Sequence, residues 1–118
     1  MKKVVILDDE EDVRMVIEMM VSEVTDDYVS FESPHDAKKY IEENSESVAL
    51  VISDYRMPEM NGIDFYKSIE SKNLPFALAT GMHPGEVADS VESPNFHVIE
   101  KPFNEDELAN LLNNFLKK

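Results

Sequence analysis

Cysteine is absent from the 118-residue sequence. The chain can therefore form no disulfide framework, no thiolate nucleophile and no cysteine-ligated zinc site. Long hydrophobic runs are absent too: the first apolar stretch, Val4–Leu7, follows Lys2 and Lys3 and is too short for a signal peptide or a membrane span. The length fits one compact domain over residues 1–118, and we expect a cytoplasmic protein.

Basic residues are scarce. The sequence has 11 Lys and Arg against 25 Asp and Glu, which gives a formal net charge of −14. Such a surface repels both a phosphate backbone and anionic lipid. We therefore expect no direct binding to nucleic acid or to membranes.

What the sequence does contain is an alternation of two kinds of segment. Short apolar runs predict strands buried on both faces, as in a parallel sheet. They lie at residues 4–7, 28–31, 48–53, 76–79 and 97–100. Apolar residues at helical spacing occur in residues 13–24, 37–41, 63–69 and 108–116, with a weaker pattern near 85–91. The alternation predicts an α/β fold, a doubly wound five-stranded parallel sheet with five helices.

Polar residues follow four of these predicted strands. Asp8 and Asp9 follow the first, and Asp54, Thr80 and Lys101 follow three later ones. The carboxyl ends of parallel strands meet at one edge of the sheet, where ligands bind. We therefore expect these side chains to lie close together.

The chemistry of this set fits phosphoryl transfer. Three carboxylates in one place repel each other, and a hard cation such as Mg²⁺ relieves that repulsion. An Asp beside the cation can attack phosphorus, while Lys101 and Thr80 offer an ammonium and a hydroxyl to the charged oxygens. Singly, each residue has a simpler interpretation: Asp8, Asp9 and Asp54 as caps, Thr80 in a turn and Lys101 as a surface cation. Their shared position at strand ends favours a site.

Four motifs carry a resemblance to a known family: Leu7–Glu10, Asp54–Gly62, Ala79–Gly81 and Lys101–Phe103. On these motifs the sequence resembles the receiver domains of response regulators in two-component signalling, over essentially the whole chain, and in particular the chemotaxis-type single-domain regulators. The resemblance implies a flavodoxin-like strand order, 2-1-3-4-5. It also implies a signalling switch rather than a turnover enzyme.

The resemblance assigns a phosphorylation site and a metal site. It implies that Asp54 is phosphorylated by a histidine kinase, a phosphotransfer protein or a small acyl phosphate. Mg²⁺, with Mn²⁺ as an alternative, would be bound directly by Asp9, Asp54 and the backbone carbonyl of Arg56. Asp8 would act through a metal-bound water.

The resemblance also concerns the residues that respond to phosphorylation. Thr80 and Lys101 would contact the phosphoryl oxygens, and the Lys101–Pro102 peptide is expected to be cis, which aims the lysine amine into the site. One position departs from the family. Val98 stands where receivers commonly carry Tyr or Phe, so we expect less conformational change through this position.

Two positions that tune phosphoryl hydrolysis in the family, the second after Asp54 and the second after Thr80, are Arg56 and Met82. Neither can orient a water as an amide or carboxylate would, so we expect a long-lived phosphoryl group. Arg56 also disfavours a Mg²⁺-dependent phosphohydrolase, which usually has an acid there. A receiver module of a hybrid histidine kinase is another alternative, although the starting methionine and the compact end favour a stand-alone protein.

The partners implied are proteins: the phosphodonor and a downstream target that the sequence does not name. We expect a monomer or weak dimer. The histidines, His35, His83 and His97, are not spaced as a metal set, and we expect them in loops or on the surface.

Overall fold

The structure is a computed structural model that describes residues 2–81, 95–101 and 105–116. At its centre lies a sheet of five parallel strands in the order β2-β1-β3-β4-β5. The strands are β1 (Lys3–Leu7), β2 (Tyr28–Phe31), β3 (Val48–Asp54), β4 (Phe76–Thr80) and β5 (Phe96–Glu100). The predicted α/β class, the parallel sheet and its strand order are confirmed.

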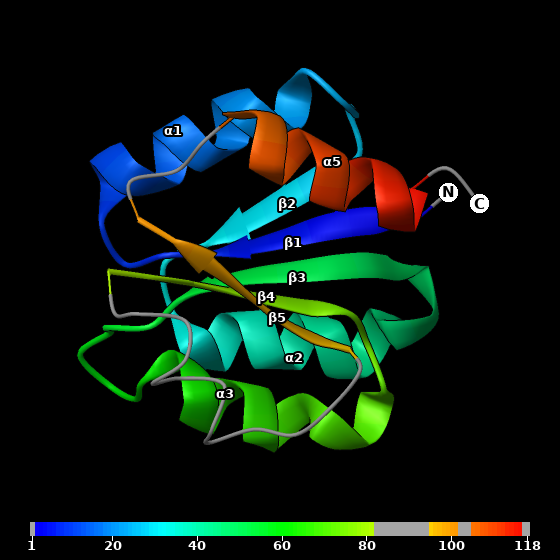
Figure 1. Cartoon of the computed structure of the whole chain (residues 1–118). Coiled ribbons are helices and arrows are strands. Elements are labelled where there is room, and N and C mark those ends of the chain that lie inside the picture. Colours follow the sequence, from blue (N-terminus) through cyan, green and yellow to red (C-terminus); the bar gives the residue numbers. More distant parts are fainter. Residues whose placement is uncertain (1, 82–94, 102–104, 117–118) are drawn as a thin grey trace.

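Helices cover both faces of the sheet. The described residues contain α1 (Glu11–Ser22), α2 (Pro34–Asn44), α3 (Gly62–Ile69) and α5 (Glu105–Leu116), together with the short 3₁₀ helices Ser45–Ser47 and Glu70–Lys72. One face lies under α1 and α5 and the other under α2 and α3 (Figure 1). The described fold therefore has four α-helices where five were predicted, because the helix expected near residues 85–91 lies outside the described residues.

Each face of the sheet has its own hydrophobic cluster. Along β1, Val4 and Ile6 belong to the cluster under α1 and α5, whereas Val5 and Leu7 belong to the cluster under α2 and α3. This alternation follows from the two-residue period of a strand. Because both faces are covered, an inner strand is apolar up to its carboxyl end, and this produces the unbroken apolar runs of the sequence.

The central strand β3 shows this most completely, since all seven of its residues are buried. It lies between β1 and β4 in the sheet. Asp54, its last residue, is only 4% exposed. A carboxylate is thus placed inside the protein by the same strand that forms the middle of its core.

The starts of two helices lie next to this end of the sheet. At α3, the Asn61 side chain accepts a hydrogen bond from the Asp64 amide at 2.8 Å, as an N-cap does. At α1, the cap position is taken by Glu10, which makes no side-chain cap bond. Asp8 and Asp9 therefore do not take the N-cap position of α1, as the interpretation of them as caps expected, although Asp8 Oδ1 accepts a hydrogen bond from the Glu10 amide at 2.9 Å.

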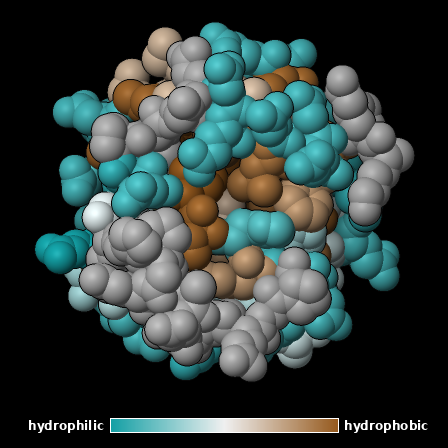
Figure 2. Space-filling model, in the orientation of Figure 1, coloured by the Kyte–Doolittle hydropathy of each residue, from teal (hydrophilic) through white to brown (hydrophobic). Residues whose placement is uncertain are grey.

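The surface agrees with the acidic composition. On the face shown in Figure 2, most described side chains are hydrophilic, and hydrophobic ones gather towards the centre, where β5 lies in front. None of the described helices is long and apolar enough to cross a membrane.

Gly62→Ala should destabilise the protein, because a methyl group has no room at this position. An ideal Cβ on Gly62 would lie 2.3 Å from Leu78 Cδ1 and 2.5 Å from the backbone oxygen of Asp54. We expect the free energy of unfolding to fall by about 1–3 kcal/mol, as in other overpacked cores. Urea unfolding measures this change. Gly81→Ala is the matched control, since no described atom lies within 4 Å of its Cβ position. A loss at Gly62 no larger than at Gly81 would contradict the prediction.

Candidate functional site

Three carboxylates meet at the carboxyl ends of β1 and β3. Asp8 and Asp9 come directly after β1, and Asp54 ends β3. One carboxylate oxygen of each residue lies within 4.8 Å of the other two. The two strands are hydrogen-bonded neighbours, with Leu7 opposite Ser53, so the residues that follow are brought together as predicted.

Lys101 reaches this cluster from β5, across β4. Its backbone amide donates to the carbonyl of Thr80 at 2.8 Å, which anchors the chain just beyond β5 to the end of β4. Its Nζ then donates to Asp54 Oδ1 at 2.7 Å. The Asp54 side chain is only 5% exposed, so water screens this ion pair little on the carboxylate side.

Thr80 ends β4, next to the cluster, and is buried. In the sheet register Ala79 lies opposite Asp54, and the Tyr55 amide donates to the Ala79 carbonyl at 3.0 Å. Thr80 therefore lies at the strand end beside that of β3. All five predicted side chains are gathered at one edge of the sheet.

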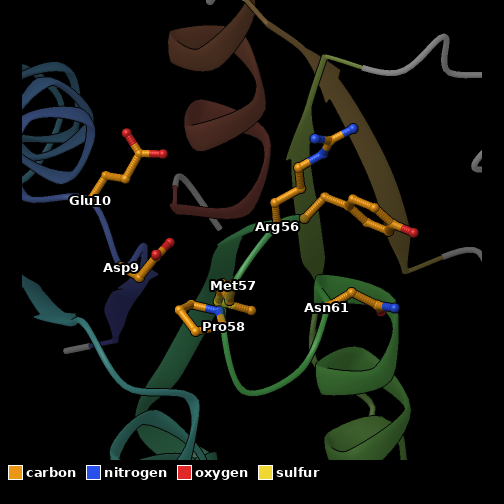
Figure 3. A pocket seen from close by; sticks show the side chains of 7 residues that line it. Asp9, Glu10, Arg56, Met57, Pro58 and Asn61 are labelled. Atoms are coloured by element: carbon orange, nitrogen blue, oxygen red, sulfur yellow. The ribbon is translucent and has the colours of Figure 1, made fainter.

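A pocket of about 420 Å³ opens beside the cluster. Asp9 and Glu10 line one side, and residues of the loop 55–61, among them Arg56, line the other (Figure 3). The ends of this loop are tied together, since the Gly62 amide donates to the Tyr55 carbonyl at 2.7 Å. This hydrogen bond closes the loop, which forms one wall of the pocket.

Two oxygens of the cluster lack a hydrogen-bond partner. Asp8 Oδ2 and Asp9 Oδ1 are buried and, in the part of the chain that the structure describes, accept no hydrogen bond. Buried carboxylate oxygens without donors are costly. A hard divalent cation takes oxygen ligands of this kind, so Asp8, Asp9 and Asp54 fit a Mg²⁺ site.

Burial raises the pKa of the Asp8 carboxyl to about 6. The hydrogen bond that its Oδ1 accepts from the Glu10 amide, at 2.9 Å, opposes this shift. The negative charges of Asp54 and Asp9 raise the pKa further, and the ammonium of Lys101 lowers it. A bound cation would favour the charged carboxylate in the same way as Lys101 does.

Other predicted residues lie away from the cluster or outside the described residues. Val98 is a half-buried residue of β5 that packs against the hydrophobic cluster under α2 and α3, so it belongs to the core. Met82 and the Lys101–Pro102 bond lie outside the described residues.

The prediction for the histidines was wrong for His97. This residue lies in β5, its ring centroid is 5.4 Å from that of Phe115 on α5, and its buried Nε2 finds no hydrogen-bond partner among the described residues. Because α5 covers this face of the sheet, the strand residue His97 is half-buried. His35 is exposed, as expected, and its Nε2 lies 2.6 Å from Glu59 Oε2. His83 lies outside the described residues.

Two residues near the carboxylate cluster were not predicted from the sequence to take part in the site. Arg14 Nη1 donates to the backbone carbonyl of Asp8 at 2.9 Å, and Glu10 lines the pocket. Glu10 could have been found from its place beside Asp9. The contact of Arg14 has no such signal, because it joins a helical side chain to the backbone of the preceding turn.

Asp8→Asn should remove a pH dependence from the stability of the metal-free protein. An Asp whose pKa rises from 3.8 to about 6 on folding binds its proton more tightly in the folded state. Its stabilising contribution is complete below the unfolded pKa and is lost as the pH rises through the folded pKa. The free energy of unfolding of the wild type should therefore fall, relative to Asp8→Asn, by about 3 kcal/mol across this window.

Urea unfolding at a series of pH values, in the presence of a chelator, measures this difference. The asparagine retains an oxygen acceptor for the Glu10 amide, and any fixed cost of the substitution does not alter the slope with pH. A difference between the two proteins that stays constant from pH 3.8 to about 6 would contradict the prediction.

Known proteins resemble this chain in sequence and in structure. The sequence profile of the response regulator receiver domain matches residues 4–113. Transcriptional regulatory protein FlgR of Helicobacter pylori is 31% identical over 103 residues, which cover 86% of this chain and 26% of FlgR, so the chain spans about a quarter of that protein's length. Chemotaxis protein CheY1 of the same organism is 29% identical over 107 residues, which cover 86% of each chain.

Among solved structures, a response regulator receiver domain protein from Clostridium thermocellum has the same fold. It superposes with a TM-score of 0.87 at 21% sequence identity, and the superposition covers 99% of this chain and 95% of that one. The profile match extends over nearly all of the residues that form the sheet and its helices. This chain therefore belongs to the family of response regulator receiver domains.

Proposed function

We propose that this chain is a phosphoacceptor switch in which Asp54 takes and releases a phosphoryl group. One observation carries the proposal: Asp54 belongs to the carboxylate cluster and also contacts the ammonium group of Lys101, whose Nζ lies 2.7 Å from Asp54 Oδ1. Membership of the receiver family supports a role in two-component signalling.

We assign the cation site of this switch to Mg²⁺, with Mn²⁺ as an alternative. Asp9, Asp54 and the backbone carbonyl of Arg56 would hold the ion directly, and Asp8 would act through a water. When bound, the ion supplies positive charge against the carboxylates and the phosphoryl oxygens. Support comes from the buried oxygens of Asp8 and Asp9 that accept no hydrogen bond from the described residues. The position of Arg56 in the loop that lines the same pocket as Asp9 supports it as well.

In the transfer step, a carboxylate oxygen of Asp54 attacks phosphorus. A new oxygen–phosphorus bond forms, the bond from phosphorus to the donor atom breaks, and its electron pair leaves with the donor, a histidine nitrogen or an acyl phosphate oxygen. Lys101, released from its contact with Asp54, pairs with the phosphoryl oxygens, and the Thr80 hydroxyl donates to them. Lys101 is a suitable group because its single charge lies on a long, flexible side chain.

This chemistry suits a switch and not a turnover enzyme. A phosphohydrolase of this kind would need a general acid two residues after Asp54, but that residue is Arg56, which has donors only and stays protonated. We therefore propose that residues 1–118 form one receiver domain that acts in the cytoplasm, as a monomer or weak dimer. It would signal through contacts with a phosphodonor protein and a downstream protein.

The phosphoryl group on Asp54 should be hydrolysed slowly in this protein. Arg56 lines the pocket beside the cluster, and its guanidinium can cover the approach to phosphorus but cannot accept a hydrogen bond from an attacking water. Met82 would likewise add cover without an amide or carboxylate to orient the water. Val98, as a core aliphatic residue, has no ring to move, so it would contribute little to the change on phosphorylation. The cis form of Lys101–Pro102 stays a prediction.

Asp54→Asn should abolish phosphorylation by a small acyl phosphate, because the amide is nearly isosteric but is not a nucleophile. Mass spectrometry of the intact protein in excess Mg²⁺ measures the phosphoryl adduct. Asp64→Asn is a matched control, since it makes the same change at an exposed position of α3 and should be labelled like the wild type. Labelling of Asp54→Asn at the rate of the wild type would remove Asp54 from its proposed role.

A protein phosphodonor also needs a surface to bind. In the described part of the chain, the exposed large hydrophobic side chains all lie on α1: Met15, Val16 and Met19, at 52%, 45% and 67% exposure. This helix begins directly after the carboxylate cluster, and its first turn carries the acidic residues Glu11 and Asp12. We assign the patch to the phosphodonor, as a site for an apolar helix face flanked by basic residues.

Met19→Ser should slow phosphorylation by a protein donor and leave phosphorylation by a small acyl phosphate unchanged, because only the protein donor covers α1. Truncating an interface residue typically costs about 1 kcal/mol or more, so we expect a loss of roughly fivefold. The measurement compares initial rates with a phosphorylated kinase or phosphotransfer protein that labels the wild type and with the acyl phosphate. Lys39→Ser, an exposed change on α2, serves as the control. An equal loss with both donors would place the defect in the site and not in the patch.

A further inference from the structure

Arg14 lies on α1, outside the carboxylate cluster, but its side chain contacts the backbone of that cluster. Its Nη1 donates to the backbone oxygen of Asp8 at 2.9 Å. Helical side chains point back towards the N-terminus of their helix, which brings the guanidinium to the turn between β1 and α1. The Arg14 side chain is only 18% exposed, so water competes little for this contact.

The carbonyl that Arg14 contacts belongs to the peptide group between Asp8 and Asp9. A peptide group is planar, so a bond that orients its oxygen also orients its N–H and the Cα atom that follows. The direction of the Asp9 side chain therefore depends on where Arg14 holds this oxygen.

Two further hydrogen bonds hold the same turn. The Asp8 amide donates to the Phe31 carbonyl of β2 at 3.1 Å, and Asp8 Oδ1 accepts from the Glu10 amide at 2.9 Å. Of these three hydrogen bonds of Asp8, the one from Arg14 is made to the carbonyl of the Asp8–Asp9 peptide. Arg14 therefore fixes this peptide on the side of Asp9.

Arg14 is itself held in place. Its Nε lies 3.9 Å from Glu18 Oε2, one helical turn further along α1. The same Glu18 oxygen accepts a hydrogen bond from the Ser30 hydroxyl on β2. Glu18 offsets the charge of the guanidinium, so Arg14 can orient the turn without adding an unbalanced cation next to a metal site.

We propose that Arg14 is a positioning residue for the cation site, which holds the Asp8–Asp9 peptide so that both carboxylates face the ion. The inference rests on the proposed function, since it requires Mg²⁺ to bind at this cluster. Partners that orient metal ligands typically contribute roughly 10–100-fold to metal affinity. A role through charge alone has the opposite sign, because removing a cation near the site would tighten Mg²⁺ binding. The sign of the change therefore separates the two roles.

Arg14→Met is the main test, because methionine keeps an unbranched apolar side chain but has neither the charge nor the donors. We expect the dissociation constant for Mg²⁺, measured by calorimetric titration with magnesium chloride, to rise roughly tenfold. Lys39→Met is the matched control: it removes one positive charge from an exposed position on α2 and should leave the constant unchanged. Equal or tighter binding by Arg14→Met than by the wild type would overturn the proposal.

Thermal unfolding in a chelator separates positioning from a structural role. A residue needed only for stability would lower the unfolding midpoint and leave the Mg²⁺ affinity of the folded protein unchanged, a result that would overturn the proposal. Arg14→Lys adds a second variant, since one ammonium cannot contact both the Asp8 carbonyl and Glu18 as the guanidinium does. Its affinity should lie between those of Arg14→Met and the wild type.

If Arg14→Met does not fold, the lysine variant decides, and an affinity equal to that of the wild type would overturn the proposal. A wild type that binds no Mg²⁺ would overturn the proposed function together with this inference. A wild type that binds Mg²⁺, with an Arg14→Met variant of equal affinity, would overturn only the role of Arg14.

Discussion

The mutual repulsion of three carboxylates at one edge of a buried sheet is the constraint on which the rest of this structure depends. Asp8 is 0% and Asp54 4% exposed, so water screens their charges little. Their convergence requires opposing positive charge. Among the described residues, Lys101 is the one that forms an ion pair with the cluster. The pKa of Asp8 is raised to about 6, chiefly by burial, and the charges of Asp54 and Asp9 add to this shift while Lys101 opposes it. The three carboxylates have the arrangement of a group that could hold a divalent cation.

The order of the strands decides which groups share this edge. β1 and β3 are neighbours at the centre of the sheet and bring the carboxylates together, while β4 and β5 bring Thr80 and Lys101 from one side. Backbone hydrogen bonds then set the finer geometry. The amide of Lys101 is anchored to Thr80, and the loop after Asp54 is closed by the bond from Gly62 to Tyr55. The site is thus held by the backbone of the sheet and its loops together with the ion pair from Lys101 to Asp54.

The same arrangement links the site to the surface. The turn after β1 carries two of the carboxylates and leads directly into α1, whose outer side carries Met15 and Met19. Arg14, on the inner side of the same helix, contacts the backbone of that turn. The exposed hydrophobic side chains of α1 thus belong to the helix that begins directly after the carboxylates and is hydrogen-bonded to their turn.

The sequence by itself determined the class of fold and the members of the site. Strands buried on both faces are apolar along most of their length, so they stand out as unbroken runs, and Asp54, Thr80 and Lys101 stand out because they directly follow such runs. Only the tertiary structure decided which distant groups contact each other. The ring contact of His97 with Phe115 on α5 and the hydrogen bond from Arg14 to the Asp8 carbonyl each join segments whose separation follows no helical or strand period, whereas Lys101 was expected beside Asp54 from the strand ends. Such contacts depend on how the helices pack on the sheet, and packing leaves no repeat in the sequence from which they could be predicted.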